Sequence, residues 1–157
     1  MKIILLAVGK TATPYISQAV EDYAKRISRY QPFEIVVTPD IKGSKTLSAE
    51  EQKAREGRLI IDFLKPGDYA ILLDERGRQL TSREFAGEIE RRGLQGYKRL
   101  VFIIGGPYGF SPEVYSTVTS MLSLSRMTFT HEMVRLFFAE QIYRAMTIMR
   151  GEPYHHD

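Results

Sequence analysis

The sequence predicts an α/β protein whose parallel β-sheet is flanked by helices on both faces. Apolar runs without polar alternation occur at residues 3–8, 69–74 and 100–104, which is typical of strands buried on both faces. Amphipathic stretches of helical length separate these runs, and strands that alternate with helices indicate a parallel sheet. The length of 157 residues, without a repeat or a change in composition, favours a single domain over residues 1–157.

The first predicted strand, residues 3–8, leads into a segment that imitates a phosphate-binding loop. Gly9, Lys10 and Thr11 match the end of the P-loop motif, but the residue four positions before Gly9 is Leu5 and not glycine. We therefore reject a P-loop. Lys10 is left as either a phosphate contact or an ordinary solvated lysine, and apolar residues at helical spacing predict a helix over about 13–30.

A second strand and a second helix are predicted next, with a polar loop between them. Residues 33–38 form the strand. Residues 40–46 are polar and carry two lysines, so we expect a mobile loop that either contacts RNA phosphates or is simply solvated. Ser48 and Glu51 have the spacing of a capping box, which begins a helix that extends to about Leu64.

The third strand, residues 69–74, ends on an acidic residue. Arg76–Arg78 is predicted to turn the chain away from the sheet. The capping-box pattern Thr81–Glu84 then begins a helix that ends near Arg92, with Gly93 in the position after the C-cap.

A glycine-rich stretch follows the fourth strand and is a candidate ligand site. Gly105, Gly106 and Gly109 come directly after the buried strand 100–104, and Ser111 has the position of an N-cap for a short helix. A strand, a glycine loop and a helix start in this order can present backbone N–H groups to a ligand. The alternative is a tight connection that needs glycine dihedral angles.

The last two elements are a short strand at 121–125 and a long helix from His131 to about Met149, capped by Thr130. This helix is apolar around nearly its whole circumference, so it must be covered on more than one side. A second copy of the chain is the preferred source of the additional cover, and the alternative is a helix in the centre of the core.

Composition excludes several classes of protein. The chain has 22 basic and 19 acidic residues, which is compatible with RNA binding but does not require it. It has no cysteine, so disulfides and thiolate metal sites are excluded, as is common in cytoplasmic proteins. No apolar run is long enough for a membrane span, and residues 1–8 are too short for a signal peptide.

Polar side chains near the carboxyl end are candidates for chemistry. His131 and Arg135 lie one turn apart on the last helix, and Glu140 and Arg144 lie one turn apart roughly opposite. The tail ends in Tyr154, His155, His156 and Asp157, after a proline that stiffens the approach. Adjacent residues seldom ligate one ion well, so we expect no metal site in this tail.

Five motifs in register carry a resemblance to a known family. They are Ile-Gly-Gly-Pro-x-Gly, Leu-Ser-Leu-Ser-x-Met-Thr, Thr-His-x-x-Val-Arg, Glu-Gln-x-Tyr-Arg-Ala and Pro-Tyr-His, and they begin at Ile104, Leu122, Thr130, Glu140 and Pro153. Together they resemble the ribosomal RNA large subunit methyltransferase H family of the SPOUT superfamily, which methylates N3 of a pseudouridine. The resemblance covers the whole chain.

The resemblance implies a deep C-terminal trefoil knot, a homodimer and the cofactor S-adenosylmethionine (SAM), without a metal or a membrane. The implied substrate is a pseudouridine in a stem-loop of 23S rRNA, within the assembled 70S ribosome in the cytoplasm. The implied cofactor contacts are Leu73, Gly105, Gly106, Leu124, Ser125, Arg126, Met127, Thr128 and Phe129.

The residue types fit this chemistry. The N3 proton must leave, and His131, Glu140 and His155 are candidates for the base or relay, with His155 preferred. Arg135 and Arg144 are expected to hold phosphate or orient the base. Tyr154 is expected to stack on the uracil ring or to hydrogen-bond with it. His156 stands where the family commonly has Lys or Arg, so this position can bind rRNA as a cation only when His156 is protonated.

Three alternative functions remain. The first is a SPOUT methyltransferase that acts on another site, such as a tRNA ribose oxygen. The second is a knotted RNA-binding protein without activity, and the third is a nucleotide-binding regulator. The last predicts cofactor binding without methyl transfer.

Overall fold

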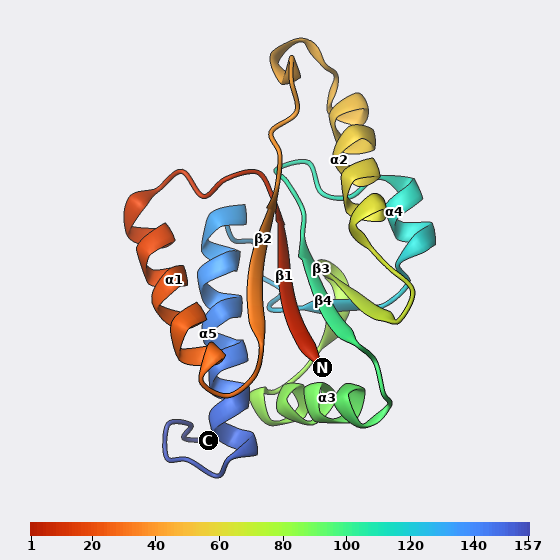
Figure 1. Ribbon diagram of the computed structural model, residues 1–157. Helices are drawn as coiled ribbons and strands as arrows, with labels where there is room; N and C mark the ends of the chain where they lie inside the picture. The colour runs from red at the N-terminus through yellow and green to blue at the C-terminus, as the bar shows by residue number, and fades with distance from the viewer.

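The computed structural model describes residues 1–157 and shows five parallel strands between two layers of helices (Figure 1). The strand order in the sheet is β2-β1-β4-β3-β5, and every neighbouring pair is parallel. The strands are β1 (Lys2–Val8), β2 (Phe33–Thr38), β3 (Asp68–Gln79), β4 (Arg99–Ile104) and β5 (Met121–Ser123). The predicted parallel sheet flanked by helices is confirmed.

Helices cover both faces of the sheet and create two separate cores. One face packs against α1 (Pro14–Ser28), α3 (Ser82–Leu94) and α5 (His131–Met149), and the other against α2 (Ala49–Phe63) and α4 (Pro112–Thr117). Successive strand residues point to opposite faces, so Leu5 and Phe102 lie in the first core, while Leu6 and Val101 lie in the second. Both cores need apolar residues, which explains why the central strands show no polar alternation.

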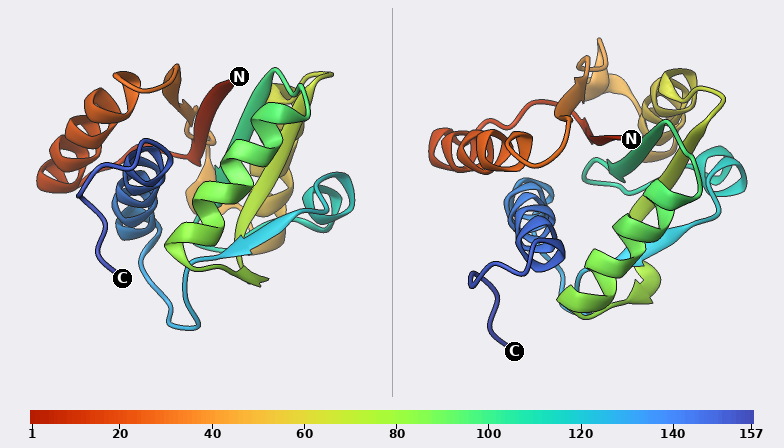
Figure 2. Two further views of the ribbon diagram at one scale, coloured as in Figure 1. Left: turned by 90° about the horizontal axis from the view of Figure 1, so that it is seen from below. Right: turned by 60° about the horizontal axis from the view of Figure 1, so that its bottom comes forward.

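The last helix is a core helix of its own chain. In both views of Figure 2, α5 lies beside α1 and near α3, and it also packs on the sheet. Its completely enclosed residues include Phe138, Ile142 and Ala145. The chain itself therefore covers most of the apolar circumference of α5, as expected for the alternative of a helix in the centre of the core. Phe137 is 39% exposed and stays uncovered.

The predicted turn at Arg76–Arg78 is wrong, because β3 continues to Gln79 and pairs with β5 across a register shift. The reason lies at Gly77, where an added Cβ would be 2.5 Å from the backbone nitrogen of Leu122. The glycine permits a close approach of two strands and does not reverse the chain.

Two helix details also differ from expectation. Gly93 lies inside α3, and the glycine with the left-handed backbone is Gly96, at φ +84°. On α2 the apolar residue Ala54 is exposed, while Glu56 and Gly57 are buried, which reverses the expectation from residue type. The full capping box of α3 is confirmed, and the loop after β2 contains a short 3-10 helix, Ser44–Thr46.

Candidate active site

A cleft of about 910 Å³ opens at the carboxyl ends of the central strands. Its walls are residues 73–75 of β3, the glycine loop after β4, the segment that joins β5 to α5, and the residues that begin α1. Open parallel sheets bind ligands at this edge, where the connections diverge. The cleft is therefore the leading candidate for the functional site.

The glycines of the loop allow close packing on two sides. A Cβ on Gly105 would be 3.1 Å from the ring of Phe110, and one on Gly106 would be 2.8 Å from Oε2 of Glu56. Gly109 adopts φ +80°, and its N–H donates to the Gly106 carbonyl at 3.1 Å. The loop thus presents main-chain atoms to the cleft without side chains in front of them.

Most of the residues that the sequence suggested as cofactor contacts line this cleft. They are Leu73, Gly105, Gly106, Leu124, Ser125, Met127, Thr128 and Phe129, whereas Arg126 is exposed and does not contribute to the lining. His131 also lines the cleft, from the first turn of α5.

The charge of the cleft is negative. Asp74, Glu75 and Glu132 line it, and none of its 26 lining residues is a lysine or an arginine. A phosphate-binding site would need cations or a set of free amides, while a cationic ligand is favoured by carboxylates. The cleft therefore suits a positively charged small molecule.

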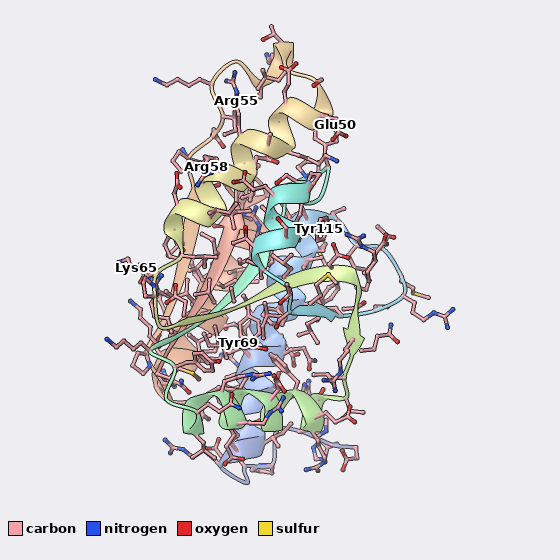
Figure 3. The ribbon with its side chains drawn as sticks, turned by 90° about the vertical axis from the view of Figure 1, so that its right-hand side faces the viewer. Glu50, Arg55, Arg58, Lys65, Tyr69 and Tyr115 are labelled. Carbon is pink, nitrogen blue, oxygen red and sulfur yellow. The ribbon has the colours of Figure 1, made fainter.

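Two of these acids are held in the ionised form. Burial disfavours the Asp74 carboxylate, but hydrogen bonds from Tyr115 and Arg76 outweigh it and the net pKa is lowered. Tyr115, labelled in Figure 3, reaches Asp74 from α4. The pKa of Glu132 is lowered mainly by the Thr13 backbone N–H, which donates at 2.9 Å. The sequence did not predict this pair of anchored acids, although Asp74 stood out as the acid after the apolar run 69–73.

Arg135 lies behind the cleft and is enclosed by protein, with 2% of its surface exposed. Its guanidinium donates to the Val8 carbonyl and to Thr11 Oγ1, each at 2.8 Å. Burial lowers its pKa, against the attraction of Glu132. In this arrangement Arg135 fixes the chain after β1, and contact with an RNA phosphate would require those bonds to break.

The other predicted catalytic residues form a cluster at the opposite end of α5. Arg144 donates to Glu140, Tyr154 donates its hydroxyl hydrogen to Glu140 Oε1 at 3.0 Å, and Arg144 Nη1 lies 3.2 Å from His155 Nδ1. An arginine can only donate, so His155 Nδ1 is the acceptor here, and Nε2–H donates to Asp157 at 2.9 Å. The imidazole is thus the neutral Nε2–H tautomer.

Electrostatics hold Tyr154 and Asp157 each in one protonation state at neutral pH. Burial, together with hydrogen bonds to Tyr23 and Glu140, raises the pKa of Tyr154, so its hydroxyl stays protonated. Hydrogen bonds from Arg83 and His155 lower the pKa of Asp157 to about 2, so its carboxylate stays charged and holds the tail. His156 is exposed, and none of these bonds involves it.

The cleft and the cluster are far apart within one chain. Arg144 follows His131 by 13 residues, which corresponds to about 20 Å along an α-helix. In Figure 1 the glycine loop lies at the upper end of β4, while the tail lies below the lower end of α5. Arg144, Tyr154 and His155 do not line the cleft; Glu140 lines a groove of about 320 Å³ that shares Leu124 and Phe129 with it.

Comparison with known proteins identifies the class of this fold and site. A family profile described as "Predicted SPOUT methyltransferase" matches residues 1–155, and the chain belongs to this family of methyltransferases. A structure of a probable methylase family protein from Haemophilus influenzae has the same fold, with a TM-score of 0.53 at 12% identity over 95% of this chain and 66% of that chain.

Closer relatives carry a more particular name, ribosomal RNA large subunit methyltransferase H. Proteins so named from Porphyromonas gingivalis and Parabacteroides distasonis are 54% and 52% identical over 157 residues, which is the full length of both chains in each pair. The protein of that name from Christiangramia forsetii is 48% identical over 99% of each chain. The resemblance that the five motifs suggested is confirmed, while the knot stays a prediction.

Two further observations concern membranes and metal ions. No helix is both long and apolar enough to cross a bilayer. No group of three or more histidine, aspartate or glutamate side chains is arranged to hold a metal ion.

Proposed function

We propose that this methyltransferase uses SAM to methylate N3 of a pseudouridine in a stem-loop of 23S rRNA, on the assembled 70S ribosome in the cytoplasm. The observation that carries the choice of cofactor is a cleft with a bare glycine loop, acidic side chains and no lysine or arginine. Relatives at about half identity over their full length support an rRNA substrate. The N3 position and the 70S ribosome come from the sequence resemblance.

The residues present fit SAM. Gly105 and Gly106 permit close approach of an adenosine, and Ile104, Leu124 and Phe129 supply apolar contacts. Asp74 and Glu132 provide carboxylates for the positive charges of the molecule. When bound, the cofactor supplies a methyl group on an electrophilic sulfonium, so the protein's contribution is alignment and management of the N3 proton.

The C-terminal cluster is the proposed site of proton handling. His155 is the proposed acceptor of the N3 proton: Nδ1 carries the electron pair of the imidazole, and Arg144, which donates to it here, must release it before the proton is accepted. Arg144 and Glu140 orient this imidazole and the nucleobase. They also hold Tyr154, Glu140 through the hydroxyl and Arg144 over the ring, and Tyr154 is the proposed aromatic contact of the uracil ring. His131 is a second candidate for proton relay, at the cleft itself. Arg135 acts by positioning the segment after β1.

A homodimer would bring these two half-sites together. Cleft and cluster are about 20 Å apart along α5, so one chain cannot present both to the same base. A second copy that packs across α5 in the opposite direction would place its cluster at the cleft of the first. The exposed pair Phe129 and Phe137, whose ring centroids are 5.0 Å apart, lies between them and supports an interface there.

The defining experiment is methyl transfer from labelled SAM to purified 70S ribosomes, free 50S subunits and bulk tRNA. We expect label in 23S rRNA of 70S ribosomes, at N3 of one pseudouridine. Label in tRNA alone would indicate a SPOUT methyltransferase for a different site. Binding of SAM without label in any RNA would favour the nucleotide-binding regulator.

A further inference from the structure

Glu56 is a buried carboxyl that the proposed mechanism does not use. It projects from α2, a helix whose other acids are solvated, and only 6% of its surface is exposed. Its Oε1 atom has no hydrogen-bond partner, and no lysine, arginine or histidine nitrogen lies within ion-pair distance of it. An unpaired buried carboxylate is costly, so its presence requires an explanation.

The carboxyl lies against the back of the glycine loop. A Cβ on Gly106 would meet Oε2 at 2.8 Å and Oε1 at 3.0 Å, so only the thickness of the main chain separates Glu56 from the cofactor cleft. A smaller hollow of about 360 Å³ behind the loop shares Pro107 and His131 with the cleft. The other titratable groups that line this hollow are Lys10 and Asp40.

We propose that Glu56 makes the site prefer the sulfonium cofactor over its neutral product, S-adenosylhomocysteine (SAH). This rests on the proposed function. When ionised, Glu56 has no ion-pair partner in the protein, and it lies directly behind the loop that would hold the cofactor, where water screens poorly. A ligand with a positive sulfur provides the missing partner, and a thioether does not.

The reaction removes the attraction as it proceeds. The S–CH₃ bond breaks, the N3–CH₃ bond forms, the sulfur keeps the electron pair and becomes neutral, and the N3 proton leaves to the base. Glu56 thus loses its partner charge at the moment of transfer, which weakens the hold on the product. A residue that only supported the loop would affect both ligands equally.

Glu56 also couples cofactor binding to protons. Burial raises the pKa of its carboxyl, with a hydrogen bond from the Gln52 amide opposing the shift. A cation on the other side of the loop favours the ionised form, so SAM binding should release a proton at mildly acidic pH, and SAM affinity should rise as pH increases through the raised pKa. Lys10, Asp40 and His131 face the same region and stay in place when Glu56 is replaced.

The test is calorimetric binding of SAM and SAH to Glu56→Gln, which keeps the shape of the side chain. Glu50→Gln is the control, because Glu50 lies on the same helix with 77% of its side chain exposed (Figure 3). We expect the ratio of SAM to SAH affinity to fall about tenfold in Glu56→Gln through weaker SAM binding, as a nearby unit charge would produce, and to stay unchanged in Glu50→Gln.

An unchanged ratio of SAM to SAH affinity, whether both affinities fall equally or neither falls, would overturn the inference and leave Glu56 as a support of the loop. If Glu56→Gln does not fold, wild-type protein decides the matter through proton release, measured from the buffer dependence of the binding enthalpy at a series of pH values above the ordinary carboxyl pKa of 4.5. Release with SAM but not with SAH supports the proposal, and equal release contradicts it. Wild-type protein that binds neither ligand would refute the proposed function itself.

Discussion

The cofactor cleft and the C-terminal cluster are built from different kinds of chemical group. The cleft consists of main chain, apolar side chains and a few acids that other residues fix in place. The cluster consists of arginine, glutamate, tyrosine and histidine side chains that bond to one another. A cofactor that brings its own reactive group requires a binding site of matching shape and charge. A nucleobase that must lose a proton requires titratable side chains nearby. The proposed function therefore assigns cofactor binding to the cleft and proton transfer to the cluster.

Replacement of His155 should separate the two regions most clearly. We expect His155→Ala to slow methyl transfer about 1,000-fold, within the usual contribution of a general base, while SAM affinity changes less than about twofold. Single-turnover methylation and calorimetric SAM binding measure the two effects. A parallel loss of SAM affinity would show that the cluster supports the fold and does not act in the chemistry.

Replacement of Gly106 should have the reverse pattern. The new methyl group in Gly106→Ala would press on both oxygens of Glu56, so the loop or the Glu56 carboxyl behind it must shift, and SAM affinity should fall about 100-fold. Gly87→Ala is the matched control, since a Cβ there meets nothing within 4 Å. If Gly106→Ala bound SAM normally, the glycine loop would not be part of the cofactor site.

A mixture of the two variants tests whether the regions act across a dimer. Random pairing of Gly106→Ala chains with His155→Ala chains gives half mixed dimers, each with one complete site. About a quarter of the wild-type methylation rate should return. The mixture is compared with each variant alone after the same unfolding and refolding. No recovery would place both regions in the same subunit's site.

The anchor of the tail should matter least. Because Asp157 is exposed, Asp157→Asn should slow methyl transfer by only about threefold, with Asp62→Asn, another exposed acid bonded by one arginine, as the control. The folded pKa of Asp157, about 2, lies below its unfolded value, so the anchor is complete above the unfolded pKa and is lost as pH falls toward 2. Tail order in NMR spectra between pH 6 and 2 provides the measurement; a loss already at pH 5 would contradict it.

The sequence predicted the cleft better than the cluster's place in the molecule. Unalternating strands and the glycines after β4 indicate a site at the strand ends by a general rule of parallel sheets. The Tyr115–Asp74 bond joins residues 41 positions apart, and no local pattern contains such a pair. The burial of Glu56 also contradicts the charged pattern of α2, because periodicity cannot show which acid packs beneath a loop. The rotation of 100° per residue indicated on which side of α5 each polar residue lies. The distance along the helix determined which of these residues could share a site.

The strand order has a consequence for synthesis of the chain. β4 lies between β1 and β3, yet it is made after both, so those two strands have no partner on their facing edges until residue 104 has left the ribosome. Sheet closure must therefore wait for about two-thirds of the polypeptide, and contacts between β1 and β4 bridge almost 100 residues. Folding of such a chain should be slow, with two unpaired strand edges exposed until β4 is available.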